Sequence, residues 1–165
     1  MPASAQGLSR SPRLPRLLTL PLGLLPPRLN SAALAQALNR VFQKELADGE
    51  LDFLDHRVMR IGIDDARLNY RLTLRQGRLE AAPPGGADDL SIDGTTYDFL
   101  LLATRREDPD TLFFNRRLRL GGDTELGLFT KNFLDSLELE DRLGPLLGVM
   151  NRAADLIGRF GSRQS

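Results

Sequence analysis

The stretch that decides the fold runs from residue 108 to residue 140 and reads DPDTLFFNRRLRLGGDTELGLFTKNFLDSLELE. It opens with residue types that begin a helix. Asp108 can cap the free backbone N–H groups, Pro109 suits the first helical position, and Asp110 is favoured at the positive end of the helix dipole. An apolar turn follows at residues 111–114. The sequence therefore predicts a short helix here.

A strand and a second helix are expected after this short helix. Residues 116–120 alternate polar and apolar side chains, which predicts a strand with Leu118 and Leu120 on one face, and two glycines end it. Asp123 or Thr124 then caps a helix. Its apolar side chains recur at helical spacing and form one stripe, which consists of Leu126, Phe129, Phe133 and Leu137.

The flanking sequence supplies the remaining elements. Alternation of polar and apolar side chains and turn residues predict strands at residues 57–63, 68–74, 78–82 and 89–92. Helices are expected from a cap at Ser31 to the Asp48-Gly49 pair, at residues 96–104, and after Gly144-Pro145. About five strands, several of them in hairpins, and about five helices on one side predict an α+β fold with a mainly antiparallel sheet.

Composition limits the chemistry that the chain can perform. The 165 residues suffice for one domain with a real core, and the absence of cysteine excludes disulfides and thiolate chemistry. The one histidine, His56, lies beside Asp55 at a strand entrance, where a surface or structural role is favoured over a catalytic triad. Acidic clusters lack the spacing of a calcium site, so neither a metal nor a cofactor is expected.

The beginning of the chain is basic and rich in leucine. Residues 1–44 carry six Arg or Lys and no Asp or Glu, so the remainder carries the opposite net charge. This asymmetry favours an anionic membrane surface over a nucleic acid. The run at residues 14–29 is too short and too proline-rich to span a membrane, and secretion is the weaker alternative. We expect a membrane-interfacial segment at 1–30, a domain at 31–160 and a tail at 161–165.

Two motifs carry a family resemblance. The run at residues 108–128 and the run DGELDFL at residues 48–54 resemble the UbiT-type accessory factors of ubiquinone biosynthesis, bacterial members of the sterol-carrier-protein lipid-binding family. Residues 34–140 follow the family pattern in order. The resemblance implies a five-stranded sheet whose helices enclose an apolar pocket, no catalytic residues, and a cytoplasmic location with peripheral attachment to the inner membrane.

An apolar set of side chains is the candidate pocket lining. It admits a filled core or a core with a lipid-sized void, and only the family resemblance favours the void. The set consists of Phe99, Leu102, Phe113, Phe114, Leu118, Leu126, Phe129, Phe133 and Met150. Arg116 and Arg117 are candidates for a head-group contact at the pocket rim, with ion pairs to Asp108 and Asp110 as the alternative.

The resemblance implies a non-catalytic carrier in the oxygen-independent branch of ubiquinone synthesis. Its expected partners are polyprenyl or quinone intermediates or a phospholipid, the peptidase-like hydroxylation factors of that branch, and the membrane surface. A lipid-acting hydrolase or transferase and an interaction scaffold with a filled core are the alternatives. The enzyme is disfavoured because the chain has one histidine and no cysteine.

Overall fold

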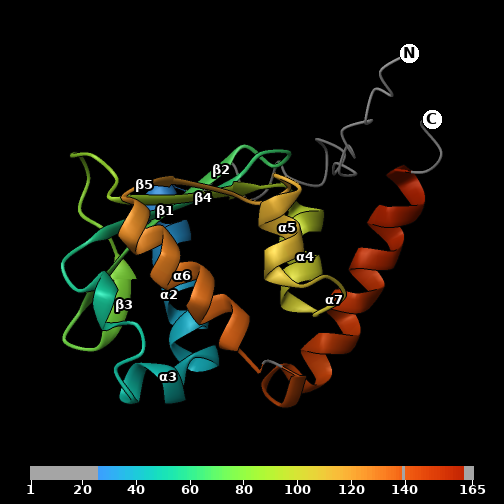
Figure 1. The fold of residues 1–165 in the computed structure, drawn as a ribbon, viewed down its shortest axis with the longest axis horizontal. Helices are drawn as coiled ribbons and strands as arrows, with labels where there is room; N and C mark the ends of the chain where they lie inside the picture. Colours follow the sequence, from blue (N-terminus) through green and yellow to red (C-terminus); the bar gives the residue numbers. More distant parts are fainter. Residues whose placement is uncertain (1–25, 139, 162–165) are drawn as a thin grey trace, which may run out of the picture.

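A five-stranded sheet lies along one side of a layer of helices in the computed structural model, which describes residues 26–138 and 140–161 (Figure 1). The strands are β1 (Val58–Ile63), β2 (Leu68–Arg75), β3 (Arg78–Ala81), β4 (Leu90–Gly94) and β5 (Arg119–Gly122). The helices are α2 (Pro27–Val41), α3 (Gln43–Ala47), α4 (Thr96–Ala103), α5 (Pro109–Phe114), α6 (Thr124–Ser136) and α7 (Glu140–Gly161), with a 3-10 turn, η1, at Asp52–Leu54.

The sheet is mixed, with the strand order β3-β2-β1-β4-β5. The pairs β1–β2, β2–β3 and β4–β5 are antiparallel, whereas β1 and β4 run parallel and bring Met59 opposite Leu90. The α+β class and the mainly antiparallel sheet are therefore confirmed. None of the helices within residues 26–138 and 140–161 is both long and apolar enough to cross a bilayer.

Three helix starts lie where the capping residues predict them. The carboxylate of Asp108 accepts a hydrogen bond from the Thr111 N–H at 2.9 Å, and Asp123 accepts from the second and third residues of α6. Thr95 and Asp98 cap α4 reciprocally, because each side chain accepts a hydrogen bond from the backbone N–H of the other. Local side-chain chemistry therefore fixes where these helices begin.

The predicted start of the first helix is wrong. Helix α2 begins at Pro27, so Ser31 lies inside the helix and does not cap it. Its buried hydroxyl accepts a hydrogen bond from the Arg71 N–H of β2 at 3.0 Å, which ties the helix to the sheet. The helix is also broken at Phe42, after which α3 continues to Ala47.

The predicted strand at residues 116–120 is shifted toward the C-terminus. Strand β5 begins at Arg119, and the preceding residues close the turn that ends α5. The N–H groups of Arg117 and Leu118 both donate to the carbonyl of Leu112, and Arg116 has a φ of 56°. Alternation in the sequence did not distinguish this turn from the strand that follows it.

The last helix has two apolar faces. It extends across Gly144, whose φ of 41° and ψ of −120° interrupt the helical backbone. One face turns inward and holds Leu147, Met150, Ala154 and Ile157. The other faces solvent and holds Leu146, Val149, Leu156 and Phe160. The helical spacing shows which apolar residues share a face, but tertiary packing decides which of the two faces is buried.

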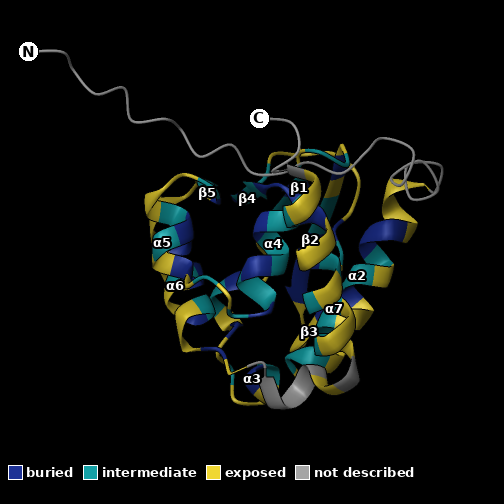
Figure 2. Cartoon of the chain, turned by 90° about the vertical axis from the view of Figure 1, so that its right-hand side faces the viewer, coloured by how far each residue is buried: buried dark blue, intermediate teal, exposed yellow. Residues whose placement is uncertain are grey.

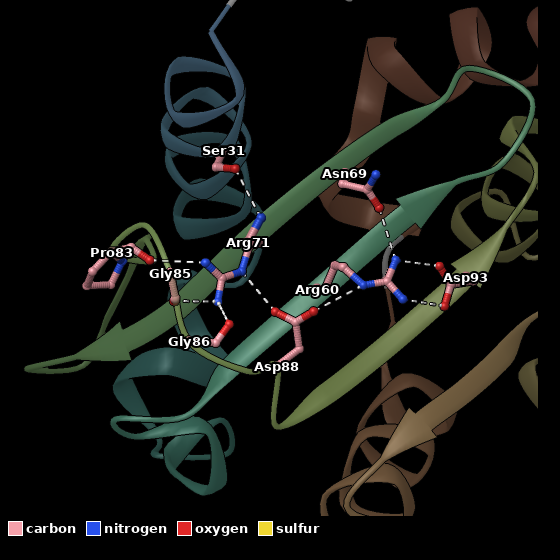
Figure 3. A network of polar contacts seen from close by, with 9 residues as sticks. All are labelled: Ser31, Arg60, Asn69, Arg71, Pro83, Gly85, Gly86, Asp88 and Asp93. Atoms are coloured by element: carbon pink, nitrogen blue, oxygen red, sulfur yellow. Dashed lines mark hydrogen bonds and ion pairs between the residues drawn. The ribbon is translucent and has the colours of Figure 1, made fainter.

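Ion pairs link the side chains of β1, β2 and β4 with the loop before β4. Figure 3 shows ion pairs between strands: the guanidinium of Arg60 lies 2.7 Å from the Asp93 carboxylate and 3.3 Å from Asp88, which also binds Arg71 at 2.8 Å. The hydrogen bond to Asp93 raises the pKa of Arg60 above its ordinary value. A Cβ at Gly62 would lie 2.1 Å from the Asp93 carboxylate, so glycine leaves room for this pair.

Helix α2 is joined to β3 by one side chain. The Asn39 amide oxygen accepts a hydrogen bond from the Leu79 N–H at 2.8 Å, and its amide nitrogen donates to the Leu79 carbonyl at 2.8 Å. Asn39 thus satisfies both backbone polar groups of one strand residue. This double contact fixes α2 beside β3.

Candidate lipid-binding site

Apolar side chains gather between the inner face of the sheet and the helices. The sheet supplies alternate residues such as Met59 and Leu72, α2 supplies Ala35, and α6 supplies Leu126 and Phe133. The fully buried members of this main cluster are Ala35, Leu51, Leu54, Met59, Leu72, Leu74, Leu79, Leu90, Ile92, Leu126, Phe133 and Leu137. The apolar stripe predicted for α6 therefore faces the sheet through Leu126, Phe133 and Leu137.

Phe133 is an aromatic anchor of the main cluster. Its ring meets the ring of Phe42 edge to face, with centroids 5.3 Å apart and planes at 87°. Phe99 and Met150, two further predicted lining residues, are half-buried and pack against the same cluster. Phe42 was not among the predicted lining residues, although its place on the apolar face of the first helix was visible in the sequence.

Three predicted lining residues belong to a second cluster between α4 and α5. Leu118 is fully buried there with Leu101 and Leu112, and Leu102 and Phe113 pack against them. Phe99 contacts both clusters. The predicted set is therefore divided between two neighbouring apolar clusters that share one aromatic ring.

The last two predicted lining residues lie nearer the surface. Phe114 ends α5 with 88% of its surface exposed, and Phe129 is 42% exposed on α6. The ring of Phe129 rests on Phe53, with centroids 5.7 Å apart and planes at 35°. Phe129 thus borders the main cluster through Phe53, whereas Phe114 faces solvent.

Arg117 contacts a buried carboxylate instead of forming an exposed rim. Its Nε and terminal nitrogen both lie 2.7 Å from one oxygen of Asp98, whose side chain is 1% exposed. The same carboxylate accepts hydrogen bonds from the backbone and hydroxyl of Thr95, and the guanidinium lies 5.5 Å from the Tyr97 ring centroid. The predicted ion pair of Arg117 with Asp108 or Asp110 is not the one observed; Asp110 binds Lys131.

The other arginines around α5 have separate roles. Arg116 is exposed, and it remains the candidate for contact with a head group. Arg105 donates hydrogen bonds to the carbonyls of Leu134 and Leu137 at the C-terminal end of α6. These carbonyls have no partner within the helix, so the guanidinium satisfies groups that would otherwise need water.

An open groove borders the main apolar cluster at Leu46. It has a volume of about 610 Å³ between the α2–α3 region and the β2–β3 turn. It is lined by Gln36, Asn39, Arg40, Gln43, Leu46, Ala47, Gln76, Gly77 and Arg78. None of the predicted lining residues borders this groove.

The one histidine and the acidic side chains of the described residues form no metal-binding group. His56 is exposed, and its Nε2 lies 3.7 Å from the carboxylate of Asp55. Within residues 26–138 and 140–161, no three His, Cys, Asp or Glu side chains are grouped to hold a metal ion. No buried side-chain nitrogen or oxygen in this part of the chain lacks a hydrogen-bond partner, so no orphaned polar group points into a reaction site.

The chain belongs to the SCP-2 sterol transfer family, whose profile matches residues 34–135. This family is a non-catalytic lipid-binding family, as the resemblance in the sequence predicts.

Individual relatives show which proteins of this family the chain is similar to. The chain is 40% identical over 143 residues to the ubiquinone biosynthesis accessory factor UbiT from Escherichia coli strain K12, covering 87% of this chain and 82% of that protein. UbiT from strains O6:H1 and O157:H7 gives the same identity and the same coverage. A solved structure of UbiJ-SCP2, a ubiquinone synthesis protein, superposes with a TM-score of 0.52. It is 16% identical, covers 65% of this chain and 94% of its own, and thus shows the shared fold.

Proposed function

We propose that this chain is a non-catalytic accessory factor of ubiquinone biosynthesis that holds prenylated intermediates, or another membrane lipid, in its apolar interior. The observation that carries the proposal is the 40% identity to UbiT over 143 residues, which covers most of both chains. Family membership supports a lipid as the ligand, since the family is one of sterol transfer.

The proposed binding region lies between the inner face of the sheet, α6 and α7. Leu126 and Phe133 provide the wall on α6, while Phe99 and Met150 provide the walls on α4 and α7. A polyprenyl tail is insoluble, and each Å² of apolar surface that it buries contributes about 25 cal/mol. The apolar walls would compensate the tail for leaving the bilayer, and the aromatic head would remain accessible to other proteins.

Helix α7 is interrupted at Gly144, and side chains join the walls of the proposed binding region to one another. Gly144 separates the first turn of α7 from the long segment that carries Met150, and its backbone conformation is one that glycine adopts readily. Arg105 holds the end of α6 from the other side through the Leu137 carbonyl. The long segment of α7 is held as well, because Arg106 of the α4–α5 loop donates hydrogen bonds to Asn151 and Asp155.

The remaining parts of the proposal extend the resemblance. The chain acts in the oxygen-independent branch of the pathway, and its protein partners are the peptidase-like hydroxylation factors of that branch. It is cytoplasmic and attaches peripherally to the inner membrane. The six positive charges among residues 1–44, without a negative one, support attraction to an anionic membrane surface.

Native mass spectrometry with lipid analysis of the purified protein tests the ligand. We expect a stoichiometric prenylated or membrane lipid that remains bound in gentle ionisation. Phe133→Leu should change the amount or chain length of the bound lipid, because it alters the wall without adding a charge. A protein that carries no lipid after purification from membranes rich in quinone intermediates would instead support a filled-core scaffold.

Complementation of anaerobic ubiquinone synthesis in a strain that lacks its own factor tests the pathway. Phe133→Asp should fail, because it places a charge in the apolar interior, while Leu128→Asp on the exposed side of α6 is the matched control and should support synthesis. His56→Ala should behave as the unmodified chain. Loss of quinone in a folded His56→Ala protein would contradict the carrier and favour an enzyme, since a catalytic acid or base contributes about 10²–10⁴-fold.

A further inference from the structure

The solvent-facing side of α7 carries a continuous apolar stripe. Leu146, Val149, Leu156 and Phe160 are each between 55% and 63% exposed. Their spacing of three, seven and four residues keeps them on one side of the helix, with Ala153 between them. Figure 2 shows the exposed side of α7 toward the viewer. Scattered surface leucines are ordinary, but an aligned row along one helix calls for an occupant.

The stripe is straight and long enough to lie on a flat surface. It runs from Leu146 to Phe160, and the fourteen steps between them, at about 1.5 Å each, correspond to roughly 21 Å. The inward face of the same helix is already used, because Ala154 and Ile157 are buried. The helix therefore remains attached to the domain while its outer face is available.

Basic side chains border the stripe. Arg152 and Arg159 are exposed, and each lies one helical turn from Leu156 along the same edge. The nearby acidic residue Asp155 is paired with Arg106 of the α4–α5 loop at 2.8 Å and also attracts Arg159. An apolar row with cations along its edge matches a membrane surface, where acyl chains lie beneath anionic phosphates.

We infer that the outer face of α7 docks the protein on an anionic bilayer, with the four apolar side chains inserted between head groups and Arg152 and Arg159 at the phosphate level. A second copy of the chain is a poorer occupant. The four side chains expose on the order of 400 Å², whereas a stable protein interface buries about 800 Å² on each partner. A membrane needs no such matching surface, and binding to it is independent of which lipid the interior holds.

Vesicle flotation of the full chain tests the docking surface. The vesicles contain phosphatidylglycerol and phosphatidylethanolamine in a 1:1 ratio, and phosphatidylcholine vesicles serve as the uncharged comparison. Leu156→Ser should lower the partition coefficient about tenfold, because one inserted leucine is lost. Leu128→Ser is the matched control, since Leu128 is 56% exposed on α6, and it should bind as the unmodified chain does. Equal partitioning of the Leu156→Ser and unmodified proteins would overturn the inference.

A tryptophan reporter tests the same surface without removing apolar area. The chain has no tryptophan, so Phe160→Trp introduces a single indole on the stripe. Its emission should shift to shorter wavelength on addition of anionic vesicles, and brominated acyl chains should quench it, while Leu128→Trp should respond to neither. An emission that is already short in wavelength without vesicles would overturn the inference: in a monomer it would show that the chain covers its own stripe, and in a dimer that a second copy does.

Discussion

The buried pair between Arg117 and Asp98 allows a test of whether Arg117 stabilises the fold or binds a ligand. Arg117→Met keeps most of the side-chain volume but removes the cation, which leaves the Asp98 carboxylate buried without its charged partner. Breaking a buried pair in this way costs about 3–5 kcal/mol. The hydrogen bonds from the Thr95 backbone and hydroxyl remain, so the lower part of that range is expected. For a chain of this length, each kcal/mol lowers the melting temperature by about 2–4 °C, so the expected loss is roughly 6–12 °C.

Urea unfolding followed by circular dichroism measures this loss directly. The double variant Asp98→Asn with Arg117→Met should recover part of it, because no charge is then left buried alone. Arg116→Met is the matched control on the neighbouring exposed residue, and its free energy of unfolding should stay within about 0.5 kcal/mol of the unmodified chain. The reasoning is refuted if Arg117→Met unfolds at the same urea concentration as the unmodified chain but no longer supports quinone synthesis, since Arg117 would then bind a head group.

Three further predictions concern packing, the beginning of the chain and pH. Phe133→Ala should destabilise the protein by about 3–5 kcal/mol in chemical unfolding, whereas Phe129→Ala, in a half-exposed site, should cost about 1 kcal/mol; equal losses would place both rings in one packed core. Removal of residues 1–25 should weaken binding to anionic vesicles at low salt, and unchanged binding would locate all membrane contact elsewhere. The hydrogen bond from Arg106 lowers the pKa of Asp155 below its ordinary value of 3.8. The pair therefore stabilises the fold above pH 3.8, and this stabilisation is lost as the pH falls below that value. In Arg106→Gln, an NMR titration should find the pKa of Asp155 returned toward 3.8.

Local signals in the sequence were sufficient for the helix starts and most strands. Asp108, Thr95 and Asp123 cap the predicted helices because their partners lie two or three residues away. The β2–β3 hairpin was equally predictable, since Gln76 and Gly77 both adopt positive φ in its turn. In each of these cases the interacting groups are close in sequence, so the pattern contains the information.

The candidate site could be predicted in part. Leu126 and Phe133 lie on the core side of α6 because the helical period determines which residues share a face. The period could not show that Phe129, on the edge of that stripe, would be half exposed. The role of Arg117 depended on Asp98, nineteen residues earlier in the chain, and no local pattern connects them. The parallel pairing of β1 with β4 was hidden for the same reason.

The two hydrogen bonds between Asn39 and Leu79 affect the tendency of the protein to aggregate. Strand β3 is the last strand at its side of the sheet, and an unpaired strand edge is a template for another chain. Asn39 presents one donor and one acceptor to Leu79, as a neighbouring strand would, and so occupies the position where intermolecular pairing would begin. An amide side chain on α2 thereby protects the protein from edge-to-edge aggregation.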